Sequence, residues 1–136
     1  MASAEQSKRI ARAYFDAVER GDRAALLALF APDAVWRVPK GAIEPYGGEH
    51  RGAQKIVDMM LGAVSAAFVP GSQRVHVKRL LAEGEVAMAE TRMTARRPNA
   101  PDYDNEYVFV FELQGGRIAE LREHVDTRTA ASAFGG

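Results

Sequence analysis

Residues 115–126 read GGRIAELREHVD, and this stretch predicts a turn followed by the last strand of the protein. Two adjacent glycines turn a backbone easily because glycine adopts positive φ at little cost. Alternate side chains of a strand share one face, which groups Ala119, Leu121, Glu123 and Val125. Glu123 is then a single carboxylate in an apolar row. Burying a carboxylate is costly unless it has a partner or a task, so we expect the function to centre on Glu123.

The composition is that of an ordinary globular protein. Its 136 residues suffice for one hydrophobic core, and we expect a single domain over residues 1–136. With 18 basic and 18 acidic residues the net charge is zero, so neither nucleic acid nor a membrane surface is expected as a partner. The absence of cysteine excludes disulfides and thiolate chemistry. There is no secretory signal and no apolar run near the ~20 residues that span a bilayer, so we expect a cytoplasmic protein.

Helical periodicity dominates the first half of the chain and strand alternation the second half. Helices are expected at 5–20, 22–30 and 53–68, with a short strand at 34–38 and a loop at 39–52. Strands are expected at 74–82, 86–95, 105–113 and 117–126, and the tail 127–136 is expected to form a short helix or to fray. This order predicts an α+β fold. A curved antiparallel sheet wrapped over three N-terminal helices would enclose a cone with an apolar interior.

The strand expected at 86–95 supplies a possible partner for Glu123. Its alternation places Met88, Glu90 and Arg92 on one face. If that face is interior, Met88 and Glu90 line the pocket and Arg92 bridges Glu90 and Glu123. One interpretation is a carboxylate kept ionised by Arg92 and directed at a proton or a water molecule. The alternative is a structural ion pair at the rim of the cone.

Aromatic residues are expected around the same interior. Tyr14 and Trp36 each combine an apolar ring with a polar group that needs a partner when buried. Tyr107 is in phase with Phe109, so both are expected to face inward. We predict that Tyr14 donates a hydrogen bond to a substrate oxygen and that the other three bind substrate. The alternative, favoured for Trp36, is that these rings are simply core.

The three histidines do not indicate a metal site, because no pair has the i, i+4 spacing of a helical zinc site. His50 lies in a glycine-rich loop, where it is either solvated or reaches the pocket. His76 and His124 are in antiphase to the apolar positions, which predicts the outer face of the sheet. Val108 and Val110 are expected on that face too, and a homodimer formed through the sheets would cover them.

Four passages resemble SnoaL-like and ketosteroid-isomerase-like proteins of the nuclear transport factor 2 superfamily. They are 14–22 (YFDAVERGD), 30–36 (FAPDAVW), 50–52 (HRG) and 116–126, where GRI leads to REHVD. The resemblance implies the fold and a homodimer. It leaves the activity open, because the superfamily includes isomerases, polyketide cyclases, epoxide hydrolases, dehydratases and non-catalytic binding domains.

Steroid isomerases of this fold use a tyrosine on the first helix, which Tyr14 matches. Their general base precedes a proline on the first strand, where this chain has Val38. Their protonated aspartate would fall near Phe109, where no acid stands. Steroid isomerisation by that mechanism is therefore not expected.

The cyclase and limonene-epoxide-hydrolase branches place an aspartate on the final strand, and Glu123 matches that position. The epoxide hydrolases add an arginine and an aspartate two residues apart on a preceding strand. Arg92 matches the arginine, but Thr94 replaces the aspartate. The extra methylene of Glu123 also moves the carboxylate by a distance that matters for reaction geometry.

Together these observations predict an enzyme without a cofactor or metal that acts on a small, apolar, oxygenated molecule by proton transfer or water activation. Glu123 is expected to be the base, Arg92 its orienting partner and Tyr14 a donor to substrate. The competing hypothesis is a non-catalytic domain of the same fold that binds a hydrophobic ligand or a partner.

Overall fold

The computed structural model describes residues 3–135. The elements follow in the order α1 (Ala4–Arg20), α2 (Arg23–Leu29), β1 (Phe30–Val38), β2 (Gly48–Arg51), α3 (Ala53–Ala67), β3 (Arg74–Glu83), β4 (Val86–Arg97), β5 (Ala100–Gln114), β6 (Arg117–Val125) and α4 (Thr127–Phe134). The predicted α+β fold, with three helices before a meander of long strands, is confirmed. The loop expected at 39–52 contains the short strand β2, which was not predicted, and the tail forms the short helix α4, one of the two outcomes expected for it.

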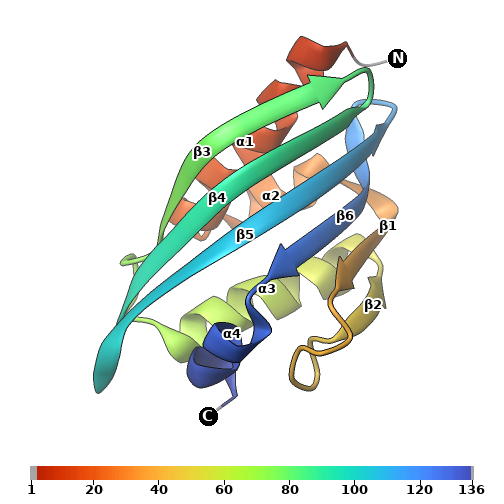
Figure 1. The fold of residues 1–136 in the computed structure, drawn as a ribbon. Helices are drawn as coiled ribbons and strands as arrows, with labels where there is room; N and C mark the ends of the chain where they lie inside the picture. Colours follow the sequence, from red (N-terminus) through yellow and green to blue (C-terminus); the bar gives the residue numbers. More distant parts are fainter. Residues whose placement is uncertain (1–2, 136) are drawn as a thin grey trace.

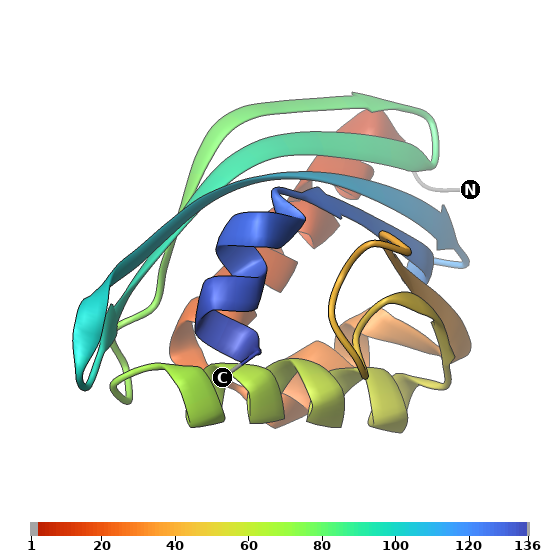
Figure 2. The same cartoon turned by 60° about the horizontal axis from the view of Figure 1, so that its bottom comes forward.

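The strands form one curved sheet in the order β2-β1-β6-β5-β4-β3, and the helices lie on its concave side (Figures 1 and 2). The sheet is antiparallel, as expected, except that β1 pairs with β6 in parallel. β1 follows two helices and enters the sheet beside the last strand, so no hairpin fixes its direction. The parallel pair places Trp36 of β1 beside Leu121 of β6.

The sequence explains the helix ends. Ser3 forms a capping box with Gln6 at the start of α1, and Gly21 ends α1 with φ of 62°. The Asp22 side chain caps α2, and the Asp126 side chain accepts hydrogen bonds from two backbone N–H groups of α4. α4 lies under the arch of the sheet, between the sheet and α3 (Figure 2). Within residues 3–135, no helix has the length and apolar character needed to cross a bilayer.

The inner face of β4 is the opposite of the predicted one. Ala87, Ala89, Thr91, Met93 and Ala95 are buried, whereas the residues between them face outward. α1 packs across β3 and β4, and the small alanine side chains let the helix approach the sheet. Both faces of β4 carry apolar residues, so alternation alone did not distinguish them.

The phase of β6 is as predicted near its end and shifted near its start. Leu121 pairs with Phe111, and Glu123 pairs with Phe109. Both phenylalanine side chains are buried. An irregularity in the β5–β6 register precedes them, so that Ile118, and not Ala119, is fully buried. An extra residue of this kind reverses the phase of the positions before it.

Candidate active site

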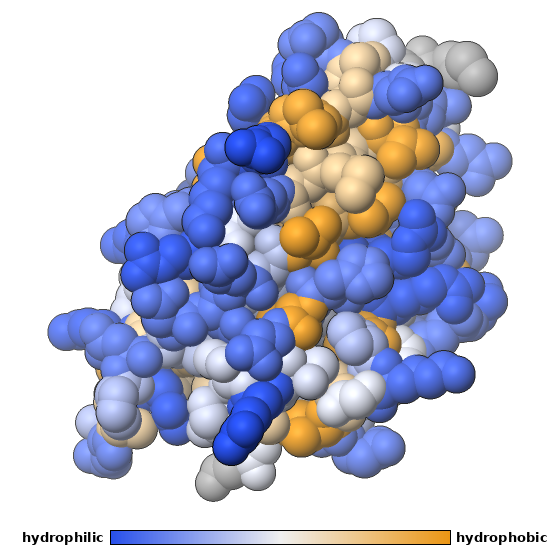
Figure 3. Space-filling view, viewed as in Figure 1, coloured by the Kyte–Doolittle hydropathy of each residue, from blue (hydrophilic) through white to orange (hydrophobic). Residues whose placement is uncertain are grey.

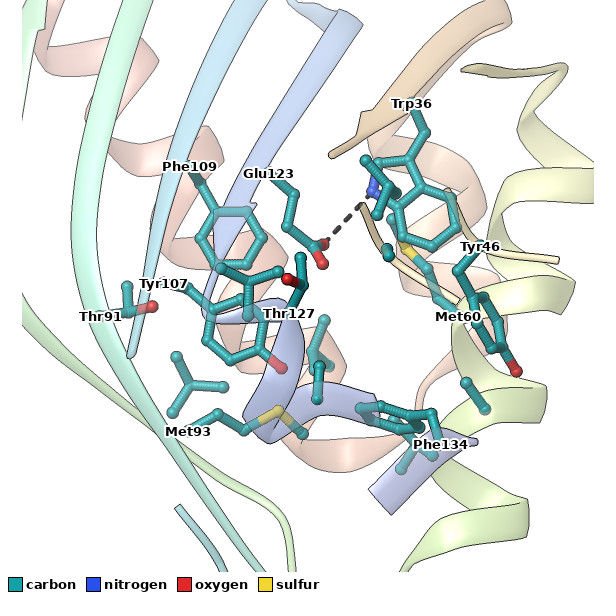
Figure 4. Close-up of a pocket in the computed structure, with 18 of the residues that line it drawn as sticks. Trp36, Tyr46, Met60, Thr91, Met93, Tyr107, Phe109, Glu123, Thr127 and Phe134 are labelled. Carbon is teal, nitrogen blue, oxygen red and sulfur yellow. Dashed lines mark hydrogen bonds between the residues drawn. The ribbon is translucent and has the colours of Figure 1, made fainter. Parts of the chain in front are cut away.

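A deep cavity opens between the sheet and the helices that it covers. It encloses about 970 Å³, its open mouth included, and its wall is mostly aromatic and aliphatic. Its lining residues include Tyr14 of α1, Trp36 of β1, Met60 of α3, Thr91 and Met93 of β4, Tyr107 and Phe109 of β5, Glu123 of β6, and Thr127 and Phe134 of α4. Figure 4 shows most of these side chains around the cavity. Its apolar wall with a few polar groups suits a small organic ligand.

Glu123 points into this cavity, as the strand phase predicted. Its Oε1 accepts a hydrogen bond from the indole Nε1 of Trp36 at 3.3 Å (Figure 4). Burial disfavours the charged form and raises the pKa of Glu123 from 4.5 to about 7, while the Trp36 hydrogen bond acts in the opposite direction. Among residues 3–135, no lysine, arginine or histidine lines the cavity. The carboxylate therefore has one donor and no cation, and it exists in both protonation states near neutral pH.

Arg92 does not contact Glu123, and that prediction is wrong. Arg92 lies on the outer face of the sheet, where its Nε and one terminal nitrogen donate to the two carboxylate oxygens of Asp104 at 2.7 and 2.5 Å. Glu90 and Met88 are also on the outer face, and Met88 is 48% exposed. The inverted phase of β4 explains all three errors. Thr91 and Met93 take the places on the cavity wall that were assigned to their neighbours.

His50 is neither a solvated loop residue nor part of the cavity wall. It is buried on β2, opposite Trp36 of β1, with the two ring centroids 5.3 Å apart. The main-chain oxygen of Tyr46 only accepts hydrogen bonds, so His50 Nε2 donates to it, at 2.7 Å. His50 thus packs against the Trp36 ring, which carries the donor to Glu123. The other two histidines, His76 and His124, are exposed on the outer face as expected.

Tyr14 lies on the cavity wall with its hydroxyl 3.6 Å from the sulfur of Met60. Burial, with a smaller contribution from the charge of Glu123, raises the pKa of Tyr14 well above its usual value. The phenol therefore stays neutral and keeps a proton to donate. A thioether is a weak acceptor, so a ligand oxygen would be a better partner for this hydroxyl.

Tyr107 and Phe109 are on the cavity wall, stacked with their ring centroids 5.5 Å apart and nearly parallel. The Tyr107 hydroxyl lies 2.7 Å from the Tyr103 hydroxyl. Asn105 Nδ2 donates a hydrogen bond to the Tyr103 hydroxyl at 2.8 Å. Sequence reasoning did not single out Tyr103 or Asn105. The sequence could have indicated both residues, because Tyr103, Asn105 and Tyr107 alternate along one strand and share its inner face.

The site has the parts for proton transfer without a metal. Within residues 3–135 there is no group of three or more histidine, aspartate or glutamate residues that could hold a metal ion. A carboxylate titrating near neutral pH can accept a proton from one atom and return it to another. Neutral phenols, an indole N–H and the hydroxyls of Thr91 and Thr127 supply the remaining polar groups, and the wall is otherwise apolar.

The fold and this cavity define a small α+β roll, and within residues 3–135 the only carboxylate side chain on its cavity wall is that of Glu123. The sequence profile of the SnoaL-like domain matches residues 11–121, and the chain belongs to the SnoaL-like family. No curated protein matches the chain in sequence.

Solved structures share the fold over nearly the whole chain. Bal32a from a soil-derived mobile gene cassette is 25% identical, with a TM-score of 0.82 and coverage of 96% of this chain and 98% of that one. A protein described as a SnoaL-like polyketide cyclase, from Jannaschia sp. CCS1, is 17% identical, with a TM-score of 0.80 and coverage of 98% and 94%. An LEH-like epoxide hydrolase from M. tuberculosis is 17% identical, with a TM-score of 0.73 and coverage of 96% and 90%. These likenesses show that the chain has the same fold as these proteins.

Proposed function

We propose that the protein is a cofactor-free enzyme of the isomerase, cyclase or hydrolase type that acts on a small, apolar, oxygenated molecule. Glu123 is the general base, and it transfers a proton or activates a water molecule. The observation that carries this proposal is the position of the carboxylate, which lies in an apolar cavity with one hydrogen-bond donor, Trp36. A buried carboxylate without a cation is costly for folding, and catalysis is a reason to keep it.

The geometry suggests how Glu123 acts. Trp36 holds Oε1, which leaves Oε2 for a proton of the substrate. In an isomerisation, a C–H bond next to a carbonyl breaks, the proton moves to Oε2, and the electron pair spreads onto the carbonyl oxygen. The proton then returns to a different carbon. Tyr14 is the proposed donor to the substrate oxygen, since its present acceptor is only the Met60 sulfur. Arg92 has no part in this mechanism.

The relatives support the choice of reaction types, at the level of fold. One similar structure is described as a polyketide cyclase and another as an epoxide hydrolase. Both activities act on oxygenated organic molecules. The cavity also favours a neutral ligand, because no cationic side chain among residues 3–135 lines it. The cytoplasmic location stays a prediction.

The proposal can be tested without knowing the natural substrate. A panel of apolar ketones in D2O reports proton abstraction through deuterium incorporation at the α-carbon, and a panel of epoxides in 18O-labelled water reports hydrolysis. Wild-type protein should accelerate one of these reactions, with a rate that rises as Glu123 ionises near pH 7. Glu123→Gln should abolish the acceleration with the fold intact. Equal rates for wild type and Glu123→Gln would refute the assignment of the base.

The second candidate is a non-catalytic ligand-binding domain, which the almost entirely apolar wall favours. Trp36 is the only tryptophan of the chain, so its fluorescence reports occupation of the cavity. A binding domain should hold its ligand equally well in wild type and Glu123→Gln and should turn over no member of either panel. Native mass spectrometry of the purified protein would identify a ligand that co-purifies.

We further propose a homodimer formed through the outer face of the sheet. Leu81 and Met88 are cross-strand partners on β3 and β4 and are 61% and 48% exposed. Val86, on the same face of β4 as Met88, adds to this apolar patch. Figure 3 shows hydrophobic side chains gathered over one end of the sheet and bordered by hydrophilic ones. Exposed apolar patches of this kind mark association surfaces, and a second copy of the chain presents a matching patch.

A further inference from the structure

Three polar side chains of β5 form a hydrogen-bonded chain that ends at the cavity. Asn105 Nδ2 donates to the hydroxyl of Tyr103, which lies 2.7 Å from the hydroxyl of Tyr107. Tyr103 is 2% exposed and Asn105 is 4% exposed, so water does not compete for these bonds. Of the three residues, only Tyr107 lines the cavity.

The donor-to-acceptor direction of this hydrogen-bonded chain follows from the orientation of the Asn105 amide, which is fixed by its neighbours. The Oδ1 atom accepts from the backbone N–H of Glu106 at 2.9 Å, and a backbone N–H can only donate. The Nδ2 atom donates to the main-chain oxygen of Asp126 at 3.1 Å, and a carbonyl can only accept. A flipped amide would lose both bonds. Nδ2 therefore faces Tyr103, and the Tyr103 hydroxyl accepts.

The Tyr103 proton has one available acceptor among residues 3–135, the Tyr107 oxygen. If Tyr107 donated instead, the Tyr103 proton would remain unpaired in the interior, which is unfavourable. With Tyr103 as donor, the unpaired proton is that of Tyr107, at the cavity wall. The chain Asn105→Tyr103→Tyr107 thus presents a free phenolic proton to whatever occupies the cavity.

We propose that the Tyr107 hydroxyl is the donor of an oxygen-binding subsite, with Tyr103 and Asn105 as its positioning residues. The subsite takes a neutral ligand with an acceptor oxygen, such as a ketone, ester or ether. The choice of ligand class rests on the proposed function, but binding of a ligand oxygen by Tyr107 requires no catalysis by Glu123.

The location of Tyr107 separates this subsite from the carboxylate. On β6, Glu123 pairs with Phe109, whereas Tyr107 pairs with Val125, one inward position further along the strands. Figure 4 shows the Tyr107 hydroxyl on the side of Met93, and the Glu123 carboxylate directed toward Trp36. In a ligand that binds both the Tyr107 hydroxyl and the Glu123 carboxylate, the acceptor oxygen is separated from the atom on which Glu123 acts. Burial, more than any charge, raises the pKa of Tyr107 well above its usual value, so the phenol keeps its proton.

The same chain of bonds also fixes one wall of the cavity. Asp126, whose main-chain oxygen accepts from Asn105, is the N-cap residue of α4. α4 contributes Thr127 and Phe134 to the cavity wall. The position of the Tyr107 donor is therefore set relative to the helix that closes this side of the pocket.

The experiment uses two probes of nearly equal shape, 2-acetylnaphthalene and 2-isopropylnaphthalene, which differ by a carbonyl oxygen. The infrared carbonyl stretch of the bound ketone reports a hydrogen bond directly, because such a bond lowers its frequency. Quenching of Trp36 fluorescence gives the two dissociation constants. These readouts are independent of turnover, so they separate a failure of this proposal from a failure of the proposed catalytic role of Glu123.

In wild type the carbonyl stretch should fall below its value in an aprotic solvent. Tyr107→Phe should remove this shift and weaken ketone binding about two- to tenfold, the range for one hydrogen bond, with little effect on the hydrocarbon. Tyr103→Phe, which keeps the ring but leaves Tyr107 unoriented, should give an intermediate shift. Tyr46→Phe removes a different phenol of the cavity wall, and the shift of the carbonyl stretch should survive it.

Several results would overturn the proposal. An unshifted carbonyl stretch in wild type would do so without any variant, as would failure of the ketone to bind up to its solubility limit. A shift that survives Tyr107→Phe but is lost in Tyr14→Phe would assign the donor to α1 instead. If Tyr107→Phe does not fold, the wild-type spectrum and the Tyr103→Phe variant still decide the outcome.

Discussion

Replacing Glu123 by glutamine should remove a pH-dependent loss of stability. The folded-state pKa of Glu123 is raised to about 7 from the ordinary value of 4.5. Between these values the folded protein binds more protons than the unfolded chain, so wild-type stability falls as pH rises from about 4.5 to beyond 7. At about 1.4 kcal/mol for each pKa unit, a rise of this size corresponds to about 3 kcal/mol. Glutamine keeps the shape and the Trp36 hydrogen bond but cannot ionise.

The measurement is urea unfolding of both proteins at about pH 4.5 and about pH 8. The stability of Glu123→Gln relative to wild type should increase by about 3 kcal/mol from the lower to the higher pH. Other titrating groups are common to both proteins and cancel in this difference. Glu106→Gln, which alters an exposed glutamate of β5, is the matched control and should show a much smaller change. A pH-independent difference between Glu123→Gln and wild type would refute the burial of the carboxylate.

Three further predictions concern other parts of the structure. Trp36→Phe removes the donor to Glu123 and should raise the pKa of that carboxyl by about one unit, because a hydrogen bond to a charge contributes about 1.5 kcal/mol or more. NMR titration of labelled glutamate measures this pKa. A pKa that falls or stays constant would contradict the assignment. Arg92→Ala breaks an exposed pair with Asp104 and should leave thermal and urea unfolding almost unchanged, with ligand binding also unchanged. A loss of binding would restore the residue to the site. Leu81→Lys should shift the protein to monomer in sedimentation velocity, and a wild-type protein that is already monomeric would exclude the proposed dimer.

Comparison of prediction and structure shows which signals are local. The caps at Ser3 and Asp22 and the glycine that ends α1 could be read directly, because each acts within one turn of the chain. The inward position of Glu123 followed from Leu121 and its neighbours, since the side chains of β6 alternate regularly there. The burial of the catalytic candidate was thus available before any coordinates.

The wrong site assignments arose on a strand whose two faces carry almost equally apolar side chains. On β4, Met88 and Met93 lie on opposite faces, and the small alanines that in fact face inward gave little signal. The choice between the faces was made by α1, which needs small residues beneath it, and not by the strand itself. Arg92 was consequently assigned to the cavity although it pairs with Asp104 outside.

Some contacts join residues that no local pattern connects. Trp36 and Glu123 are 87 residues apart in sequence, and they meet because β1 joins the sheet parallel to β6. His50 is buried for the same reason, since β2 adds to the sheet beside β1. By itself the sequence determined the order of helices and strands and the burial of one carboxylate, because those depend on periodicity along the chain. The tertiary structure alone decided what surrounds that carboxylate, because strand order and helix packing bring distant side chains together.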